Sequence, residues 1–248
     1  MNVELAALSL APGLAVGSFL NVVAARIPLR RSIVSPGSAC MSCGTQLAWY
    51  DNVPLLSYAL LRGKCRHCSA AISWRYPAVE AATALLVAGS ALKFGWSWDF
   101  AVAAVFCAVL IAITATDLER RIIPNRIVVP ASVVLLGAQT IIHPSVQWAA
   151  GAAGAGAFFL LAALAYPGGM GMGDVKLAFL LGAVLGKTVP VGLLAGMITA
   201  LVPAAVLAAR HGGAARKMAI PFGPFLALGA VLALFAGRPI LDWYLGVL

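Results

Sequence analysis

Long apolar runs separated by short polar segments make up most of the chain. Eight runs are candidates for membrane spans, at about residues 5–25, 77–95, 98–116, 127–143, 148–166, 175–187, 189–209 and 222–240. An α-helix needs about 20 apolar residues to cross the hydrocarbon core of a bilayer. The run at 175–187 is short, so we expect it to be tilted or sheltered by neighbouring helices. The pattern predicts an all-α polytopic membrane protein with about eight transmembrane helices.

The composition agrees with a membrane protein and disfavours a soluble one. Hydrophobic residues make up 62% of the chain and charged residues 10%, whereas soluble domains carry about 25% charged residues. The net charge of +9 would indicate nucleic acid as the partner of a soluble protein. Here the basic residues lie between the apolar runs, so we expect membrane lipid as the partner and no nucleic acid.

The distribution of lysine and arginine predicts the orientation. If the N-terminus is outside, the connections after the first, third and seventh spans are cytoplasmic, as is the start of the sixth span. Those regions hold all of the 17 basic residues except Lys93, Lys187 and Arg238. The positive-inside rule therefore predicts that both termini lie outside. Asp117 and Asp174 are then both at cytoplasmic ends of spans.

One sizeable segment lies outside the predicted spans. We therefore expect a first transmembrane helix at residues 1–25, a cytosolic loop at 26–76 and a transmembrane core at 77–248. The loop is too small to bury a large hydrophobic core. Small domains of this kind usually need a staple such as a bound metal.

Four cysteines in this loop have the spacing of a metal site. Cys40 and Cys43 form one C-x2-C pair, and Cys65 and Cys68 form a second pair 21 residues later. Two such pairs complete a tetrahedral site of four thiolates, which suits structural zinc. Two disulfides or four free thiols are the alternatives, and a reducing cytosol disfavours disulfides. We interpret Cys107 as a small buried residue of the third span.

Two aspartates stand out by their context. Asp117 ends one apolar run, and Asp174 begins another directly after the glycine-rich residues 171–173. Ionisable residues at membrane depth are costly and usually mark function. Each also has a purely structural interpretation, since Asp174 could cap a helix and Asp117 could pair with Arg120 or Arg121.

Together, the two aspartates suggest a specific chemistry. Like charges a few Å apart do not both ionise readily, so two such carboxylates share a proton. The ionised member activates water while the protonated member polarises a peptide carbonyl, as in aspartyl proteases. The chain has no H-E-x-x-H, G-x-S-x-G or P-loop motif. A proton- or ion-coupled transporter that uses the two aspartates, and a membrane-anchored zinc scaffold, remain alternatives.

Six motifs in order give the chain a resemblance to a known family. The paired cysteines are one of them, and the others are GSFLNVVAARIP (17–28), RYPAVEAAT (75–83), TDLERRIIPN (116–125), GMGDVKL (171–177) and IPFGPFLALG (220–229). With them the chain resembles the type IV prepilin peptidases, which belong to the GxGD class of intramembrane aspartyl proteases. The PFGP segment is expected to shape a broken helix start near the site.

The resemblance implies a function and its residues. Asp117 and Asp174 would be the catalytic pair, and the substrates would be prepilins and pseudopilins with a basic leader and an apolar helix. Cleavage would occur at the cytoplasmic face of the bacterial inner membrane. Relatives with the cytosolic loop are expected also to methylate the new N-terminus with S-adenosylmethionine, although no methyl-donor motif is visible in the chain.

Four further polar residues in these motifs have more than one interpretation. Glu80 either pairs with Arg75, or faces an active cavity and assists methylation. Asn21 and Asn125 are candidates for hydrogen bonds between helices. Lys176 either acts on the neighbouring carboxylate or extends to the membrane interface.

Overall fold

The computed structural model describes residues 2–166, 169–212 and 220–247, most of which are helical. Within these ranges the backbone forms no β-strand, only two isolated bridges. The long helices are α1 (Asn2–Arg26), α3 (Arg75–Phe94), α4 (Trp98–Arg120), α5 (Asn125–Ile142), α6 (Gln147–Ala165), α7 (Met172–Leu185), α8 (Val189–His211) and α9 (Gly223–Val247). The short elements are η1 (Ile27–Leu29), η2 (Trp49–Asn52), α2 (Leu56–Leu60) and η3 (Gly186–Thr188).

The helices agree with a multi-pass membrane protein. Seven stretches are long and apolar enough to cross a membrane, and α7 and α8 form one of them, Met172–His211, with η3 between the two helices. At 14 residues, α7 is shorter than the usual span, as expected for the sixth apolar run. The predicted all-α fold with about eight helices is therefore confirmed. α4 continues to Arg120, so Asp117 lies within that helix and not after it.

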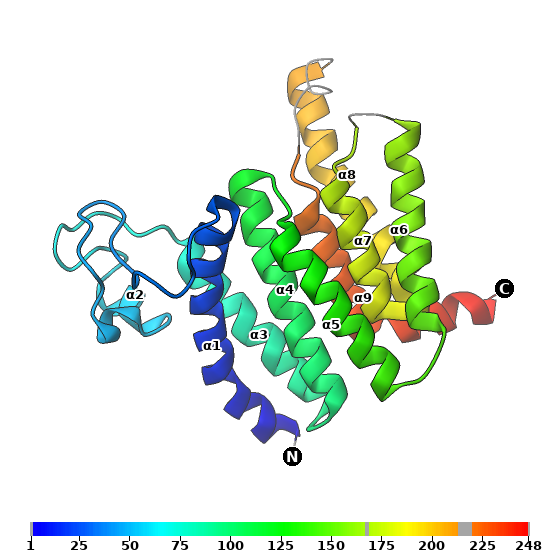
Figure 1. The fold of residues 1–248 in the computed structure, drawn as a ribbon, viewed down its shortest axis with the longest axis horizontal. Coiled ribbons are helices and arrows are strands. Elements are labelled where there is room, and N and C mark those ends of the chain that lie inside the picture. Colours follow the sequence, from blue (N-terminus) through cyan, green and yellow to red (C-terminus); the bar gives the residue numbers. More distant parts are fainter. Residues whose placement is uncertain (1, 167–168, 213–219, 248) are drawn as a thin grey trace. The chain divides into compact units, whose positions relative to one another are not determined.

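The chain forms two compact units, residues 1–115 and 116–248, and the boundary falls within α4. In the first unit, α1 and α3 pack side by side (Figure 1). Two glycines of α1 make this approach possible. A Cβ on Gly13 would lie 2.8 Å from Ala84 Cα, and one on Gly17 would lie 2.7 Å from Glu80 Cα. The small residues therefore bring the two backbones together.

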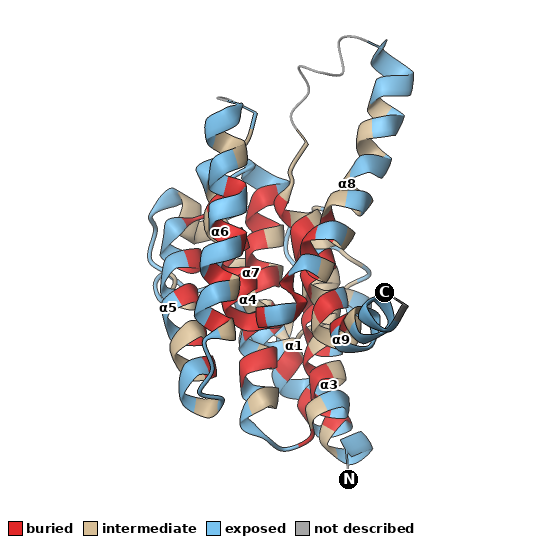
Figure 2. Ribbon diagram, turned by 90° about the vertical axis from the view of Figure 1, so that its right-hand side faces the viewer, coloured by how far each residue is buried: buried red, intermediate tan, exposed pale blue. Residues whose placement is uncertain are grey.

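The second unit is built around α7, which packs against α5, α6 and α9, while α8 packs on α9. Figure 2 shows that buried residues gather along α7. A helix that is apolar on all sides is expected to be buried in this way. Glycines again set the spacing, because a Cβ on Gly182 of α7 would overlap the carbonyl of Gly151 in α6. The Gly/Ala-rich stretch of α6 thus serves close helix packing.

Candidate active site and metal centre

Asp117 is held near the end of α4 by the start of another helix. Its side chain is buried, and Oδ2 accepts a hydrogen bond of 2.9 Å from the backbone N–H of Gly223, the first residue of α9. A Cβ at position 223 would lie only 2.8 Å from the same oxygen, so this contact requires glycine. Arg121 lies within electrostatic range, but the described residues include no ion pair between Asp117 and Arg120 or Arg121. Pairing with an arginine therefore does not explain this carboxylate.

Asp174 is the third residue of α7 and is half-buried. The capping position belongs to Gly171, so Asp174 is not the helix cap. The preceding glycines allow close approach. A Cβ added to Gly171 would lie 3.4 Å from Asp174 Oδ2, and one added to Gly173 would lie 3.0 Å from Ile123 Cβ. The first turn of α7 can therefore pack against the segment between α4 and α5.

The fold places the carboxyl groups of the two predicted aspartates within electrostatic range of each other. The carboxyl group of Asp117 acts electrostatically on that of Asp174, although the two come from different helices. In the part of the chain that the structure describes, neither carboxylate forms an ion pair with lysine or arginine. Two carboxyl groups in this arrangement can share one proton and act as a paired acid and base.

The four loop cysteines converge on one point. Their sulfur atoms all lie within 4.8 Å of one another, and the cysteines are not joined by disulfides. Cys40 Sγ and Cys68 Sγ are 3.8 Å apart. Bonds of about 2.3 Å from zinc to each sulfur would place two tetrahedral thiolates about 3.8 Å apart. The donor set and its spacing therefore fit a zinc ion. His67 is exposed and is not part of the cluster.

The two cysteine pairs have the same backbone geometry. In each, the carbonyl of the first cysteine accepts a hydrogen bond from the residue four positions later, and that residue has a positive φ. The equivalent bonds are Gly44 N to Cys40 O (2.9 Å), Ser69 N to Cys65 O (3.0 Å), Cys40 N to Thr45 O (2.9 Å) and Cys65 N to Ala70 O (2.9 Å). The equivalent bridges are Ala39 with Gln46 and Lys64 with Ala71. The loop thus contains two copies of one turn, each built around a pair of cysteines.

Local hydrogen bonds favour thiolates at three of these cysteines. Backbone N–H groups of Cys43 and Ser42 lower the pKa of the Cys40 thiol, and those of Cys68 and His67 lower that of Cys65. The hydroxyl and backbone of Thr45 lower the pKa of Cys43. At Cys68 the Ala70 backbone favours the thiolate, but burial and the other three cysteines outweigh it and raise the pKa to about 11. A bound cation would remove that mutual repulsion.

The chain is similar to known proteins over most of its length. Residues 12–94 match the Bacterial Peptidase A24 N-terminal domain, and residues 104–205 match the Type IV leader peptidase family. A prepilin leader peptidase/N-methyltransferase of Bacillus subtilis is 39% identical over 94% of this chain and 95% of its own length. The chain belongs to the type IV leader peptidase family. Two proteins of the same name are also similar. One, from Burkholderia pseudomallei, is 37% identical over 92% of this chain and 84% of its own length. The other, from Pseudomonas aeruginosa, is 35% identical over 94% of this chain and 91% of its own length. No solved structure matches the chain.

Other polar residues of this family member connect its elements. Lys176 Nζ donates a 2.8 Å hydrogen bond to Asn125 Oδ1, which joins α7 to the start of α5. Asn21 donates to the carbonyl of Tyr76, so it does link α1 to α3. Glu80 accepts a 2.8 Å bond from the Leu55 backbone N–H. A pairing with Arg75, one of the two alternatives for Glu80, is not among the contacts of the described residues. Glu80 instead anchors the loop between α1 and α3.

The backbone hydrogen bond from Gly223 to Asp117 was not predicted from the sequence. The PFGP motif was expected near the site as a broken helix start, and α9 does begin at Gly223. Phe222, beside it, stacks on Phe159 of α6 with ring centroids 6.2 Å apart. The motif therefore fixes the position of one carboxylate directly.

Proposed function

We propose that this membrane protein cleaves the basic leader peptide of type IV prepilins and pseudopilins, with Asp117 and Asp174 as its catalytic pair. We also propose that it methylates the new N-terminus with S-adenosylmethionine, since the names of its relatives combine both activities. The observation that carries the peptidase assignment is that two carboxyl groups from separate helices lie within electrostatic range of each other, without a basic ion-pair partner among the described residues.

The proposed hydrolysis uses one shared proton. The ionised carboxylate takes a proton from a water molecule whose oxygen attacks the peptide carbonyl carbon. The protonated carboxyl group donates a hydrogen bond to the carbonyl oxygen, which becomes negatively charged as the tetrahedral intermediate forms. The C–N bond then breaks, and the leaving amine receives a proton from the pair. The Gly223 N–H keeps one carboxylate in place throughout.

The proposed location follows from the charge distribution. The excess of lysine and arginine in alternate connections supports a cytoplasmic position for the cysteine loop and for both aspartates. In bacteria this orientation corresponds to the inner membrane. A basic leader entering from the cytoplasm would then reach the carboxylates, while the apolar helix of the substrate stays in the lipid.

We further propose that the four cysteines hold structural zinc. Four thiolates leave no open position for a reactive water, which indicates a role in folding and not in hydrolysis. The matching turns and the spacing of the sulfur atoms support this assignment. The zinc would replace the hydrophobic core that the small loop lacks.

The test is cleavage of a purified prepilin in liposomes by the wild-type protein and by Asp117→Asn and Asp174→Asn. Glu119→Gln is the matched control, since Glu119 is an exposed carboxylate on the same helix. We expect cleavage by the wild type and the control, and none by the two asparagine variants. Normal cleavage by either variant would refute the assignment. Proton flux through liposomes without cleavage would favour the transporter alternative.

A further inference from the structure

A large cavity lies in the first unit, away from the two aspartates in the sequence. It has a volume of about 400 Å³ and is bounded by the end of α1, the start of α3 and the cysteine loop. Its walls include the apolar side chains of Val22, Leu61 and Ile72, and the aromatic rings of Tyr58 and Tyr76. The size is within the usual range for a small-molecule site, about 300–1,000 Å³.

Two charged side chains line this cavity and have no ion-pair partner among the residues that the structure describes. Glu80 is buried at 8% exposure, and its hydrogen-bond partner among the described residues is neutral, namely the Leu55 N–H. Within the described part of the chain, Arg26 donates to the carbonyls of Ser32 and Gly37, each at 3.1 Å. The unpaired charge of the buried Glu80 is costly, whereas Arg26 is only half-buried. The cavity therefore presents a carboxylate and a guanidinium that a ligand carrying both charges would satisfy.

The other carboxylate at this cavity is already neutralised. Asp51 accepts hydrogen bonds from Arg66 Nη2 at 2.7 Å and Nε at 2.9 Å, and its side chain is only 4% exposed. That bidentate pair holds the loop together. Glu80 is thus the carboxylate available to a cationic ligand.

We propose that this cavity binds S-adenosylmethionine. The inference rests on the proposed N-methylation and gives the methyl donor a location. The sulfonium and ammonium groups of this molecule are cationic and match Glu80, while its carboxylate matches Arg26, which has further N–H donors to offer. The apolar and aromatic walls suit the adenine ring.

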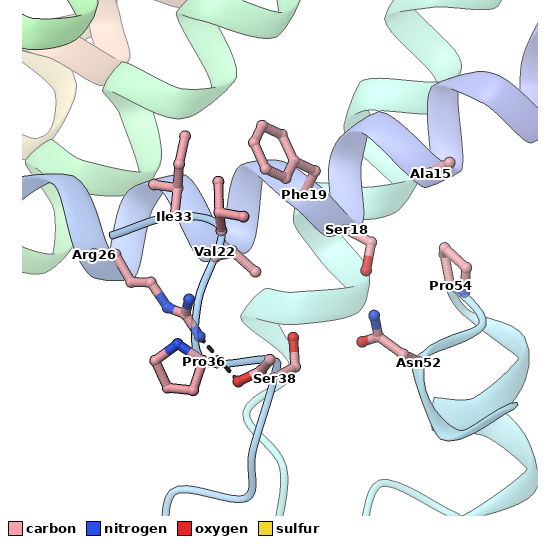
Figure 3. Close-up of a pocket in the computed structure, with 12 residues that line it drawn as sticks. Ala15, Ser18, Phe19, Val22, Arg26, Ile33, Pro36, Ser38, Asn52 and Pro54 are labelled. Carbon is pink, nitrogen blue, oxygen red and sulfur yellow. Dashed lines mark hydrogen bonds between the residues drawn. The ribbon is translucent and has the colours of Figure 1, made fainter. Parts of the chain in front are cut away.

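A second cavity, next to the first, gives the amine of the new substrate N-terminus a route to the bound methyl donor. It has a volume of about 340 Å³ and shares Ser18, Val22 and Arg26 with the larger cavity. Figure 3 shows it between α1 and the loop, with Phe19 and Ile33 on its apolar side. When bound, S-adenosylmethionine supplies the methyl group. The amine nitrogen bonds to the methyl carbon as the C–S bond breaks, and the electron pair of the C–S bond stays on sulfur. The amine proton passes to water. The apolar start of a cleaved substrate would occupy this second cavity.

The test measures binding directly, on the full-length, zinc-loaded protein in detergent. Equilibrium dialysis would compare S-adenosylmethionine with S-adenosylhomocysteine, whose sulfur is neutral. Glu80→Gln keeps an oxygen to accept the Leu55 N–H but removes the charge. Glu4→Gln is the matched control, because Glu4 is an exposed carboxylate of the same unit that does not line the cavity.

We expect Glu80→Gln to weaken S-adenosylmethionine binding about tenfold and S-adenosylhomocysteine binding less than about threefold, since the lost interaction is between charges. Glu4→Gln should change neither affinity. Ala25→Leu is a second variant, which adds bulk inside the cavity from a helix where leucine is well tolerated. It should weaken both ligands at least about tenfold by occupying their space.

Three results would overturn the proposal. The first is unchanged affinity for both ligands in Ala25→Leu, which decides the matter even if Glu80→Gln fails to fold. The second is an equal loss of both ligands in a folded Glu80→Gln protein. The third is a wild-type protein that cleaves prepilin but binds no S-adenosylmethionine, which would also remove methylation from the proposed function while leaving the peptidase intact. Failure of cleavage with normal binding would instead count against the peptidase alone.

Discussion

Replacing Gly223 by alanine should damage catalysis without damaging the fold. The added Cβ would lie 2.8 Å from Asp117 Oδ2, so the carboxylate must retreat by about 0.6 Å to reach ordinary van der Waals contact. That shift also strains the 2.9 Å hydrogen bond from the backbone N–H of residue 223. Alanine is acceptable at the start of a helix, so α9 should form normally.

The magnitude follows from how strongly catalysis depends on position. A displacement of about 1 Å can reduce a rate about 100-fold, so a shift of this size should lower kcat between about 10-fold and 100-fold. KM should change less than about twofold, because the substitution alters one carboxylate and not the surface that holds the substrate.

The assay is steady-state cleavage of a purified prepilin by protein in liposomes. Gly154→Ala is the control, because a Cβ at that position of α6 meets no atom within 4 Å. It should retain the wild-type kcat. If Gly223→Ala cleaves within about twofold of this control, the position of Asp117 does not limit the reaction and the reasoning is wrong.

Three other predictions concern helix packing and the metal. Gly182→Ala should lower the free energy of unfolding by about 3 kcal/mol or more, since its Cβ would overlap the Gly151 carbonyl. The control Gly137→Ala, whose Cβ has open space, should not lower it. Equal melting temperatures for the two variants would contradict the α6–α7 packing. Thr45→Val removes the hydroxyl that most lowers the pKa of Cys43. Because zinc needs the thiolate and protons compete for it, this variant should release zinc at a higher pH than the wild type as the solution is acidified; a metal-sensitive dye reports the release, and an identical profile would refute the role of the hydroxyl. Removing the proposed zinc with a chelator should weaken S-adenosylmethionine binding about tenfold or more, because two of the four cysteines line the proposed cavity. Equilibrium dialysis measures the affinity, and added zinc should restore it. Unchanged affinity would show that the loop holds its shape without metal.

The membrane helices were accessible from the sequence because their signal is local. Most of the apolar runs are long enough to identify a span, and the run that became α7 is the short exception. The ends of the helices were less accurate, as at α4, which continues past Asp117 to Arg120. The nearness of the two aspartates was also predictable in outline. Alternating connections place both at the same end of their spans, and the glycines before Asp174 indicate close approach.

The remaining contacts depend on tertiary packing between distant segments. The Gly223 N–H reaches Asp117 across more than 100 residues of sequence, and Lys176 turns to Asn125 and not to its neighbouring carboxylate. In neither pair does the sequence around one residue indicate which residue it will contact. The same holds for Glu80, for which Arg75 was one candidate partner. Its carboxylate instead accepts the Leu55 N–H, where Leu55 has a φ of 58°.

The central claim is that the two carboxyl groups act as one catalytic unit. The most direct test is the single-turnover rate of prepilin cleavage by Asp117→Asn, Asp174→Asn and the double variant, all in the same liposomes. Groups that work as a unit lose their contribution together, so each single variant should fall by about 1,000-fold or more, and the double variant should lie within about threefold of them. Separate losses that add up in the double variant, or a single variant that still cleaves at a rate near the wild type, would contradict the account.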